Sequence, residues 1–259
     1  MRATRPLFIF LVSLFFTQFI VAQRVIIKQN PGLSSNVIVG QQYFHVSESL
    51  YTEQEIGPNN FLSPSESIDK ISFFIKNSGI SPVINQYRIL LKEVPSTMRT
   101  LGVSSYSTDD YVEVFNGNVD MSVTGEVEVP LSTPFVRTAG NNMMVMIERM
   151  DSVQHFGFVF ETSNGLENET NAQSSRRYND SVRPELSTTL LSTTFFRPAI
   201  SFIHVFPSDV AVTGIFHPTT SCFDTLQTIR VVIQNQGLNT IDSGSVMVTL
   251  NLGDENPST

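Results

Sequence analysis

The sequence contains one cysteine, Cys222, and no tryptophan among its 259 residues. A single cysteine cannot form an internal disulfide, so a folded chain must rely on its apolar core. Twenty phenylalanines, with many valines and isoleucines, can supply that core. We expect Cys222 either to pair with a cysteine that this sequence does not contain or to be a buried free thiol.

Basic residues are also scarce. The chain has 16 Lys and Arg against 24 Asp and Glu, which gives a formal net charge of −8. An acidic chain without basic runs repels phosphate backbones, so the composition argues against nucleic-acid binding.

Only one apolar run is long enough to be a targeting segment. Leu7–Phe16 follows Arg2 and Arg5, and the small residue Ala22 precedes Gln23, which is the pattern of a secretory signal peptide over 1–22. The run is shorter than the roughly 20 apolar residues of a membrane-spanning helix. We therefore expect an exported chain, secreted or held at the outer cell surface, with no membrane span after cleavage.

Catalytic signatures are missing. The sequence has no G-x-S-x-G elbow, no H-E-x-x-H zinc helix and no phosphate-binding glycine loop. Its four histidines are scattered singly, and we expect them to be ordinary strand or loop residues: His45, His155, His204 and His217. The sequence thus predicts no catalytic residue, no cofactor and no enzyme.

One segment has the composition of a metal loop. Asn116, Asn118 and Asp120 place side-chain oxygens at alternate positions around Gly117, which suits a structural calcium ion. The alternative is a β-hairpin turn, because Asn-Gly is a strong two-residue turn signal.

Apolar and polar residues alternate along most of the chain, which is the pattern of half-buried β-strands. The clearest runs are 71–75, 87–91, 127–131, 143–147 and 199–205. With turn signals between them, these runs predict an all-β fold, a jelly-roll β-sandwich over 23–206. The polar stretch 161–194 is expected to form long loops with one or two edge strands.

A second unit is expected over 207–259. Strands predicted at 209–215, 226–234 and 245–252 correspond to the first half of an immunoglobulin-like β-sandwich. Since half a sandwich leaves an apolar face uncovered, we expect the chain to be the N-terminal part of a longer polypeptide with further domains.

Several segments of the first unit resemble a known family. Their order and spacing are similar to those of jelly-roll modules in Bacteroidota surface proteins, including the cleaved-adhesin modules of gingipain and haemagglutinin type: Tyr51–Gly57, Ile68–Phe73, Val114–Gly117, Leu131–Phe135 and Gly140–Val145. The family's tryptophan is replaced here by Val127. In the second unit, Asp209–Thr213 and Val231–Gly237 resemble the immunoglobulin-like adhesion repeats of bacterial exoproteins. The resemblance implies cell-surface binding and export through the type IX system.

Three Asp-Ser/Thr-aliphatic triplets resemble the O-glycosylation acceptor pattern of exported Bacteroidota proteins. They make Ser152, Ser181 and Thr225 candidate modification sites. Phe74 and Tyr111 fall outside the inward register of their strands and are candidates for a sugar-stacking surface, or else they pack beneath a loop.

Taken together, these features predict a non-catalytic, adhesin-type binding module of a larger surface or secreted protein. Its partner would be a host or cell-surface glycan or protein, bound by loops at one end of the sandwich. Two alternatives remain: an accessory region of an exported protease or glycosidase whose catalytic domain lies elsewhere, and a structural stalk.

Overall fold

The chain divides into two compact units. The computed structural model describes residues 23–28, 31–35, 37–57, 67–164, 174–205, 210–216, 230–235 and 240–241. One unit is Ala22–Val205, and the other includes Phe206–Thr259. Residues 1–22, Cys222 and Thr225 lie outside the described residues.

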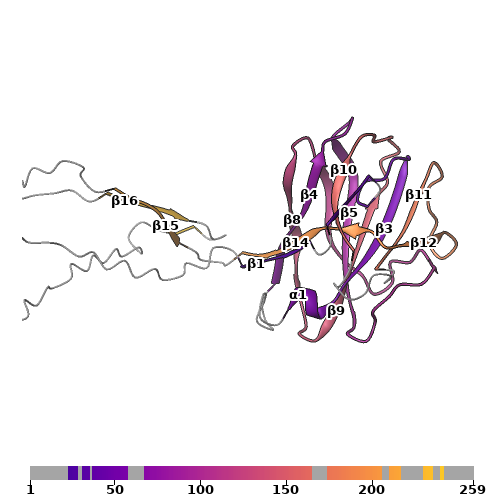
Figure 1. The fold of residues 1–259 in the computed structure, drawn as a ribbon, viewed down its shortest axis with the longest axis horizontal. Helices are drawn as coiled ribbons and strands as arrows, with labels where there is room; N and C mark the ends of the chain where they lie inside the picture. Colours follow the sequence, from indigo (N-terminus) through magenta and orange to yellow (C-terminus); the bar gives the residue numbers. More distant parts are fainter. Residues whose placement is uncertain are drawn as a thin grey trace, which may run out of the picture. The chain divides into compact units, whose positions relative to one another are not determined.

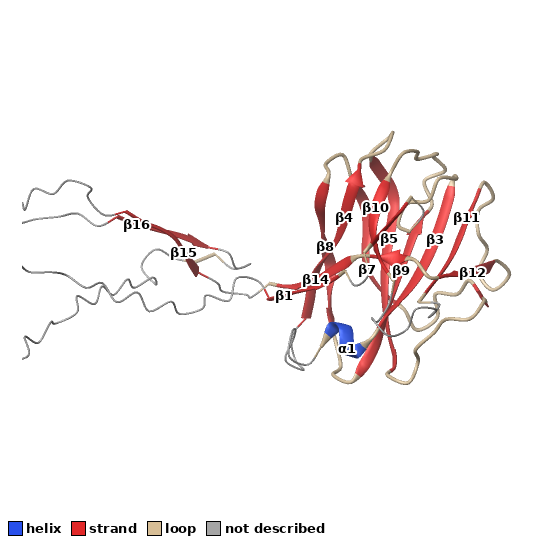
Figure 2. Cartoon of the chain, viewed as in Figure 1, coloured by secondary structure: helices blue, strands red, loops and turns tan. Residues whose placement is uncertain are grey.

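The larger unit consists of two antiparallel sheets of seven strands each (Figures 1 and 2). The first sheet contains β1 (Gln23–Ile27), β2 (Gly32–Ser34), β4 (Ser67–Asn77), β8 (Gly125–Val136), β10 (Val159–Ser163), β13 (Arg197–Pro198) and β14 (Ile200–His204). The second runs in the order β6 (Ser104–Ser105), β12 (Leu190–Thr194), β11 (Ser175–Asp180), β3 (Phe44–Tyr51), β9 (Asn141–Arg149), β5 (Val83–Pro95), β7 (Val112–Asp120).

Most connections between successive strands cross from one sheet to the other. The chain passes from β3 to β4 to β5, and again from β7 to β8, β9, β10 and β11, with a change of sheet at each step. This alternation is the connectivity of a jelly roll. The predicted all-β sandwich is therefore confirmed.

The inward faces of both sheets form one core. Ile71, Phe73 and Ile75 of β4 are buried, as their alternation predicts. Phe158 and Phe160 stack with their ring centroids 5.7 Å apart. Burying a side chain of this size contributes about 1.5–3 kcal/mol, so the core can stabilise the unit without a disulfide.

The outer face of the second sheet is also covered. Met144 and Met146 of β9 point away from the main core and are nevertheless buried, in two smaller clusters that include Tyr106 and Leu101. These covering residues come from the segment between β5 and β7. Both faces of β9 are packed, and this explains why its sequence is a nearly continuous apolar run.

Two buried carboxylates on that outer face each accept hydrogen bonds from one tyrosine and one arginine. The Tyr111 hydroxyl and the Arg176 guanidinium both donate to the buried carboxylate of Glu48. Tyr106 and Arg88 do the same for Glu148.

The polar stretch 161–194 was expected to form long loops with one or two edge strands. Its strand β11 instead lies inside the second sheet, between β12 and β3.

The one helix of the described residues, α1 (Glu53–Ile56), is a single turn. Thr52 and Glu55 form a reciprocal capping box at its start. Glu55 also pairs with the buried guanidinium of Arg197, which ties α1 to β13. No helix of the described residues is long and apolar enough to cross a membrane.

The strand β8 forms an edge of the first sheet. It pairs with β4 alone and carries Pro130 and Pro134. Proline cannot donate to a strand ladder, so both residues suit an edge position.

The second unit contains an antiparallel pair, β15 (Val210–Phe216) and β16 (Arg230–Asn235). These strands correspond to the first two predicted there. The third predicted strand, 245–252, lies outside the described residues.

Candidate functional site

Three loops, and a fourth segment that includes the start of β5, meet at one end of the sandwich. We call this surface the loop end and define it as segments 37–43, 78–86, 121–124 and 150–158. Backbone hydrogen bonds join three of them: Met121 N donates to Pro82 O (2.9 Å), and Ile80 N donates to Phe156 O (2.7 Å).

The two ends of the larger unit lie away from this surface. Gln23 at the start of β1 pairs with His204, and β14 runs beside the beginning of β4. The loop end follows the opposite termini of these strands, such as Asn77 of β4. It is therefore the end of the sandwich remote from both chain connections.

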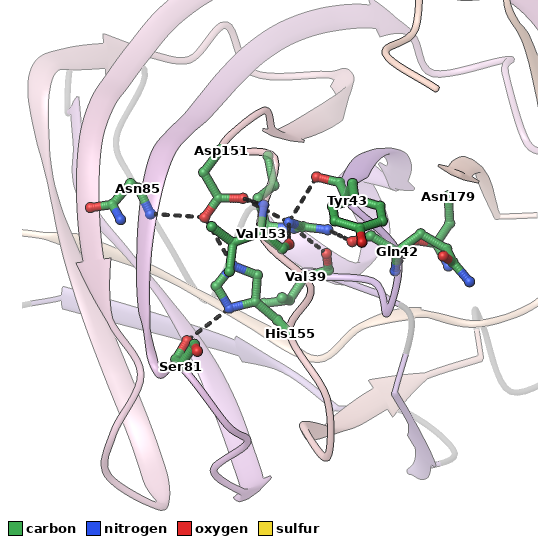
Figure 3. Close-up of polar contacts among 10 residues, drawn as sticks. Val39, Gln42, Tyr43, Ser81, Asn85, Asp151, Val153, His155 and Asn179 are labelled. Carbon is green, nitrogen blue, oxygen red and sulfur yellow. Dashed lines mark hydrogen bonds and ion pairs between the residues drawn. The ribbon is translucent and has the colours of Figure 1, made fainter. Parts of the chain in front are cut away.

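A buried arginine at the end of β9 fastens two of the loops. Figure 3 labels the residues around it, among them Val39, Tyr43 and Asp151. Arg149 is fully buried. Its guanidinium donates to the carboxylate of Asp151 (2.7 Å) and to four carbonyl oxygens, those of Val39 (2.6 Å), Tyr43 (3.0 Å), Val153 (2.6 Å) and Gln42. One side chain thus satisfies carbonyl groups of segments 37–43 and 150–158 at once.

The carboxylate of Asp151 is fully engaged. Besides Arg149 it receives the backbone N–H groups of Asn85 and Val153, both at 3.3 Å, and Nε2 of His155 at 2.9 Å. Burial alone would raise the pKa of Asp151, but the hydrogen bonds and charges of His155 and Arg149 outweigh it and hold the pKa below its usual value. The Asp151 carboxylate thus has no lone pair left with which to coordinate a metal ion or to act as a general base.

His155 bridges two loops. Its Nδ1 lies 2.7 Å from the carbonyl oxygen of Ser81, and its Nε2 contacts Asp151. Both partners are acceptors, so both hydrogen bonds form together only when the ring carries two protons. A Ser-His-Asp triad needs the histidine nitrogen opposite the carboxylate to face a nucleophile. Here that nitrogen faces a backbone carbonyl.

Backbone strain is concentrated at the same end. Of the five non-glycine residues with positive φ among those described, three belong to the loop end: Ser81 (57°), Gln86 (51°) and Ser152 (58°). Such conformations persist only where surrounding contacts enforce them, and they gather at binding and active sites. The hydrogen bonds of Asp151, Arg149 and His155 are those contacts.

His45 lies beneath segment 37–43. It is fully buried, and neither ring nitrogen has a partner within hydrogen-bonding geometry. Burial, followed by the charges of Arg149 and Arg177, lowers its pKa to about 3, with the Val37 backbone acting in the opposite direction. The ring is therefore neutral near pH 7.

The predicted calcium residues do not form a loop. Asn116, Asn118 and Asp120 lie at alternate positions of β7, so the hairpin turn is not formed there either. The Asn116 amide donates to Glu113, and Ser122 N donates to Asp120. In the described part of the chain, no group of three or more His, Cys, Asp or Glu side chains is placed to hold a metal ion. The calcium hypothesis remains a prediction without a cluster to support it.

The other predicted residues are dispersed. Ser152 and Ser181 are both exposed, each in a loop that follows a strand, so both hydroxyls are accessible to a modifying enzyme. Phe74 packs under the ammonium group of Lys28, 3.3 Å from the ring centroid, and Tyr111 is tied to Glu48. Neither aromatic residue forms an exposed sugar platform.

The residues that organise the loop end were not singled out from the sequence for that role. In the sequence, Asp151 belongs to one of the three glycosylation-like triplets, Asp151-Ser152-Val153, and Arg149 belongs to no motif. The available signal was an arginine and an aspartate two residues apart, directly after an apolar strand. A charged pair in that place is ordinarily exposed to solvent, and here both side chains are buried.

Comparisons with known proteins place the chain only loosely. No family model and no curated protein matches it, so the resemblance to cleaved-adhesin modules stays a prediction. A solved structure with some likeness contains the cysteine protease and lectin-like domains of Cwp84, a surface layer associated protein of Clostridium difficile. The match has a TM-score of 0.36 and 10% sequence identity. It covers 67% of this chain and 35% of the other chain.

Proposed function

We propose that the chain is a non-catalytic binding module of an exported, adhesin-type protein, and that its ligand contacts the loop end. The observation that carries this proposal is the set of left-handed residues Ser81, Gln86 and Ser152, held rigid by the buried cluster around Arg149. A surface fixed before the ligand arrives loses little conformational entropy on binding.

The engagement of the ionisable groups supports a binding role over a catalytic one. Asp151 and His155 are saturated by protein partners, and His45 is buried and neutral. A general base must reach the proton that it removes, and these groups already have fixed partners or are closed off.

Export is proposed from the signal-like sequence of residues 1–22. The first strand of the described residues, β1, begins at Gln23, directly after the predicted cleavage position, so cleavage there would not cut into any strand that the structure describes. Immobilised glycans and extracellular proteins are accordingly the first ligands to screen.

The test is a pair of binding screens with the purified chain, one on glycans and one on extracellular proteins. We expect a saturable ligand whose affinity falls at least about tenfold in the double variant Ile80→Ala/Phe156→Ala, both exposed at the loop end. Val136→Ala, equally exposed but on β8 at the other end, is the matched control. Blank screens would favour a structural stalk, and turnover of a peptide or glycan by the chain alone would favour a hydrolase.

A further inference from the structure

One turn of the loop end covers a buried histidine. The turn 40–43 joins the buried segment 37–39 to β3, and Gly40 lies against the His45 ring, since a Cβ at Gly40 would be 2.7 Å from Nδ1 of His45. We propose that the turn 40–43 is an acid-operated latch, closed over the neutral His45 ring and released when that ring takes up a proton. The inference goes beyond the proposed function and needs no ligand.

The turn is held mainly by hydrogen bonds. The Arg149 guanidinium donates to the carbonyl oxygens of Gln42 and Tyr43, and the N–H of Gln42 donates to Asn179 Oδ1 at 3.2 Å (Figure 3). The side chains of Gln42 and Tyr43 are exposed, whereas the preceding residues 37–39 are buried in the core. The turn can therefore open by breaking a few polar contacts while the apolar segment before it stays in place.

The closed turn leaves the His45 ring without a group that would stabilise a proton. The ring is fully buried, and neither nitrogen has a partner in hydrogen-bonding geometry. The charges that act on it are positive, those of Arg149 on β9 and Arg177 on β11, and Asn179 of β11 is neutral. The Asp151 carboxylate is already bound to the Arg149 guanidinium at 2.7 Å. A protonated His45 would thus be a further cation beside cations, which is costly in a buried position.

This arrangement makes the opening of the turn depend on pH. While the turn is closed, burial, followed by the charges of Arg149 and Arg177, lowers the pKa of His45 to about 3. When the turn opens, water reaches the ring and the pKa returns toward its ordinary value of 6.5. The open state therefore binds the proton first as the pH falls, and below pH 6.5 the opening equilibrium rises by up to about tenfold per pH unit. Above pH 6.5 neither state is protonated, and the latch stays closed.

The first test places a fluorescent reporter in the turn. The chain contains no tryptophan, so Tyr43→Trp introduces a single one, at a side chain that is 39% exposed and whose backbone carbonyl remains available to Arg149. We expect the fluorescence anisotropy of the full chain to fall reversibly between about pH 6.5 and about pH 4, with an unchanged far-UV circular dichroism spectrum. Adding His45→Phe should abolish this change. Adding His204→Gln, at the opposite end of the sandwich, should not.

Hydrogen exchange of the unsubstituted chain gives a second readout. The protection of the Gln42 amide, corrected for the intrinsic exchange rate, should fall about 100-fold between about pH 7.5 and about pH 4.5. Low concentrations of urea should leave that protection unchanged, because a local opening exposes little surface. The amides of β9 should be better protected, and urea should lower their protection. His45→Gln, which also cannot take up a proton, replaces His45→Phe if the latter does not fold.

Three results would overturn the inference. Anisotropy and Gln42 protection that do not change with pH would show that the turn stays closed. A transition that persists without His45 would assign the proton to another group. Equal protection of Gln42 and β9, with the same dependence on urea, would show that His45 is protonated only on global unfolding. None of these results bears on the loop end as a ligand surface, which the binding screens decide separately.

Discussion

Arg149 and His45 lie directly opposite each other on β9 and β3, and both side chains are fully buried. The guanidinium makes five hydrogen bonds to oxygen atoms, while neither imidazole nitrogen has a partner in hydrogen-bonding geometry. The cation is thus stabilised by its contacts, and the neutral ring beside it cannot take up a proton without placing a second cation in the same buried space.

The first prediction concerns acid stability. With a folded pKa of about 3 against 6.5 in the unfolded chain, His45 binds a proton in the unfolded state first. Stability is therefore fully present above pH 6.5 and falls as the pH drops toward 3, by up to about 1.4 kcal/mol per pH unit from this residue. Urea denaturation of wild type and His45→Phe at several pH values checks this, and parallel pH profiles would contradict it.

The second prediction concerns the arginine. Arg149→Met leaves the buried Asp151 carboxylate with fewer partners and removes the donors to four carbonyl oxygens. We expect a loss of about 3–5 kcal/mol in the free energy of unfolding and faster hydrogen exchange in segments 37–43 and 150–158. Lys76→Met breaks an exposed pair with Glu161 and should cost less than about 1 kcal/mol. Similar losses in the two variants would show that Arg149 has no special structural role.

The third prediction separates two glycines. Gly79→Ala forces a methyl group against Phe156 O and the Phe158 ring and should destabilise the unit by about 1–3 kcal/mol. Gly102→Ala adds a methyl group with no atom within 4 Å and should change stability by less than about 0.5 kcal/mol. Thermal unfolding of both variants is the measurement, and a silent Gly79→Ala would mean that the loops are looser than described.

The fourth prediction concerns the buried pair of Glu55 and Arg197. Each single variant, Glu55→Gln or Arg197→Met, leaves the other group buried without its partner and should cost about 3–5 kcal/mol. The double variant should cost clearly less than the sum of the two. A double-mutant cycle by chemical denaturation tests the coupling, and additive losses would argue that the pair does not interact energetically.

The sequence predicted the sandwich because its signal is local. Ile71, Phe73 and Ile75 alternate with residues that face outward, and β4 forms where this period requires. The period could not assign both faces of β9, since Met144 and Met146 are buried by residues that lie far away in the chain.

The loop end could not be predicted in the same way. Arg149 bonds to carbonyl groups more than 100 residues distant, and Asp151 bonds to Asn85, 66 residues away. Those partners are backbone atoms, which leave no trace in the residue types. Likewise, the Asn116-Gly117 step has the composition of a turn, but pairing with β5 holds it in a strand.

The side-by-side arrangement of β1 and β14 has a mechanical consequence. Residues 23 and 204 form the last pair of these antiparallel strands, so the two points where the chain enters and leaves the sandwich are adjacent. Tension applied between them would load one pair of strands in an unzipping direction, where hydrogen bonds break in turn and not all at once. Under such pulling β1 would peel away first, while β3, β5 and β9, which lie in the other sheet, would remain unloaded.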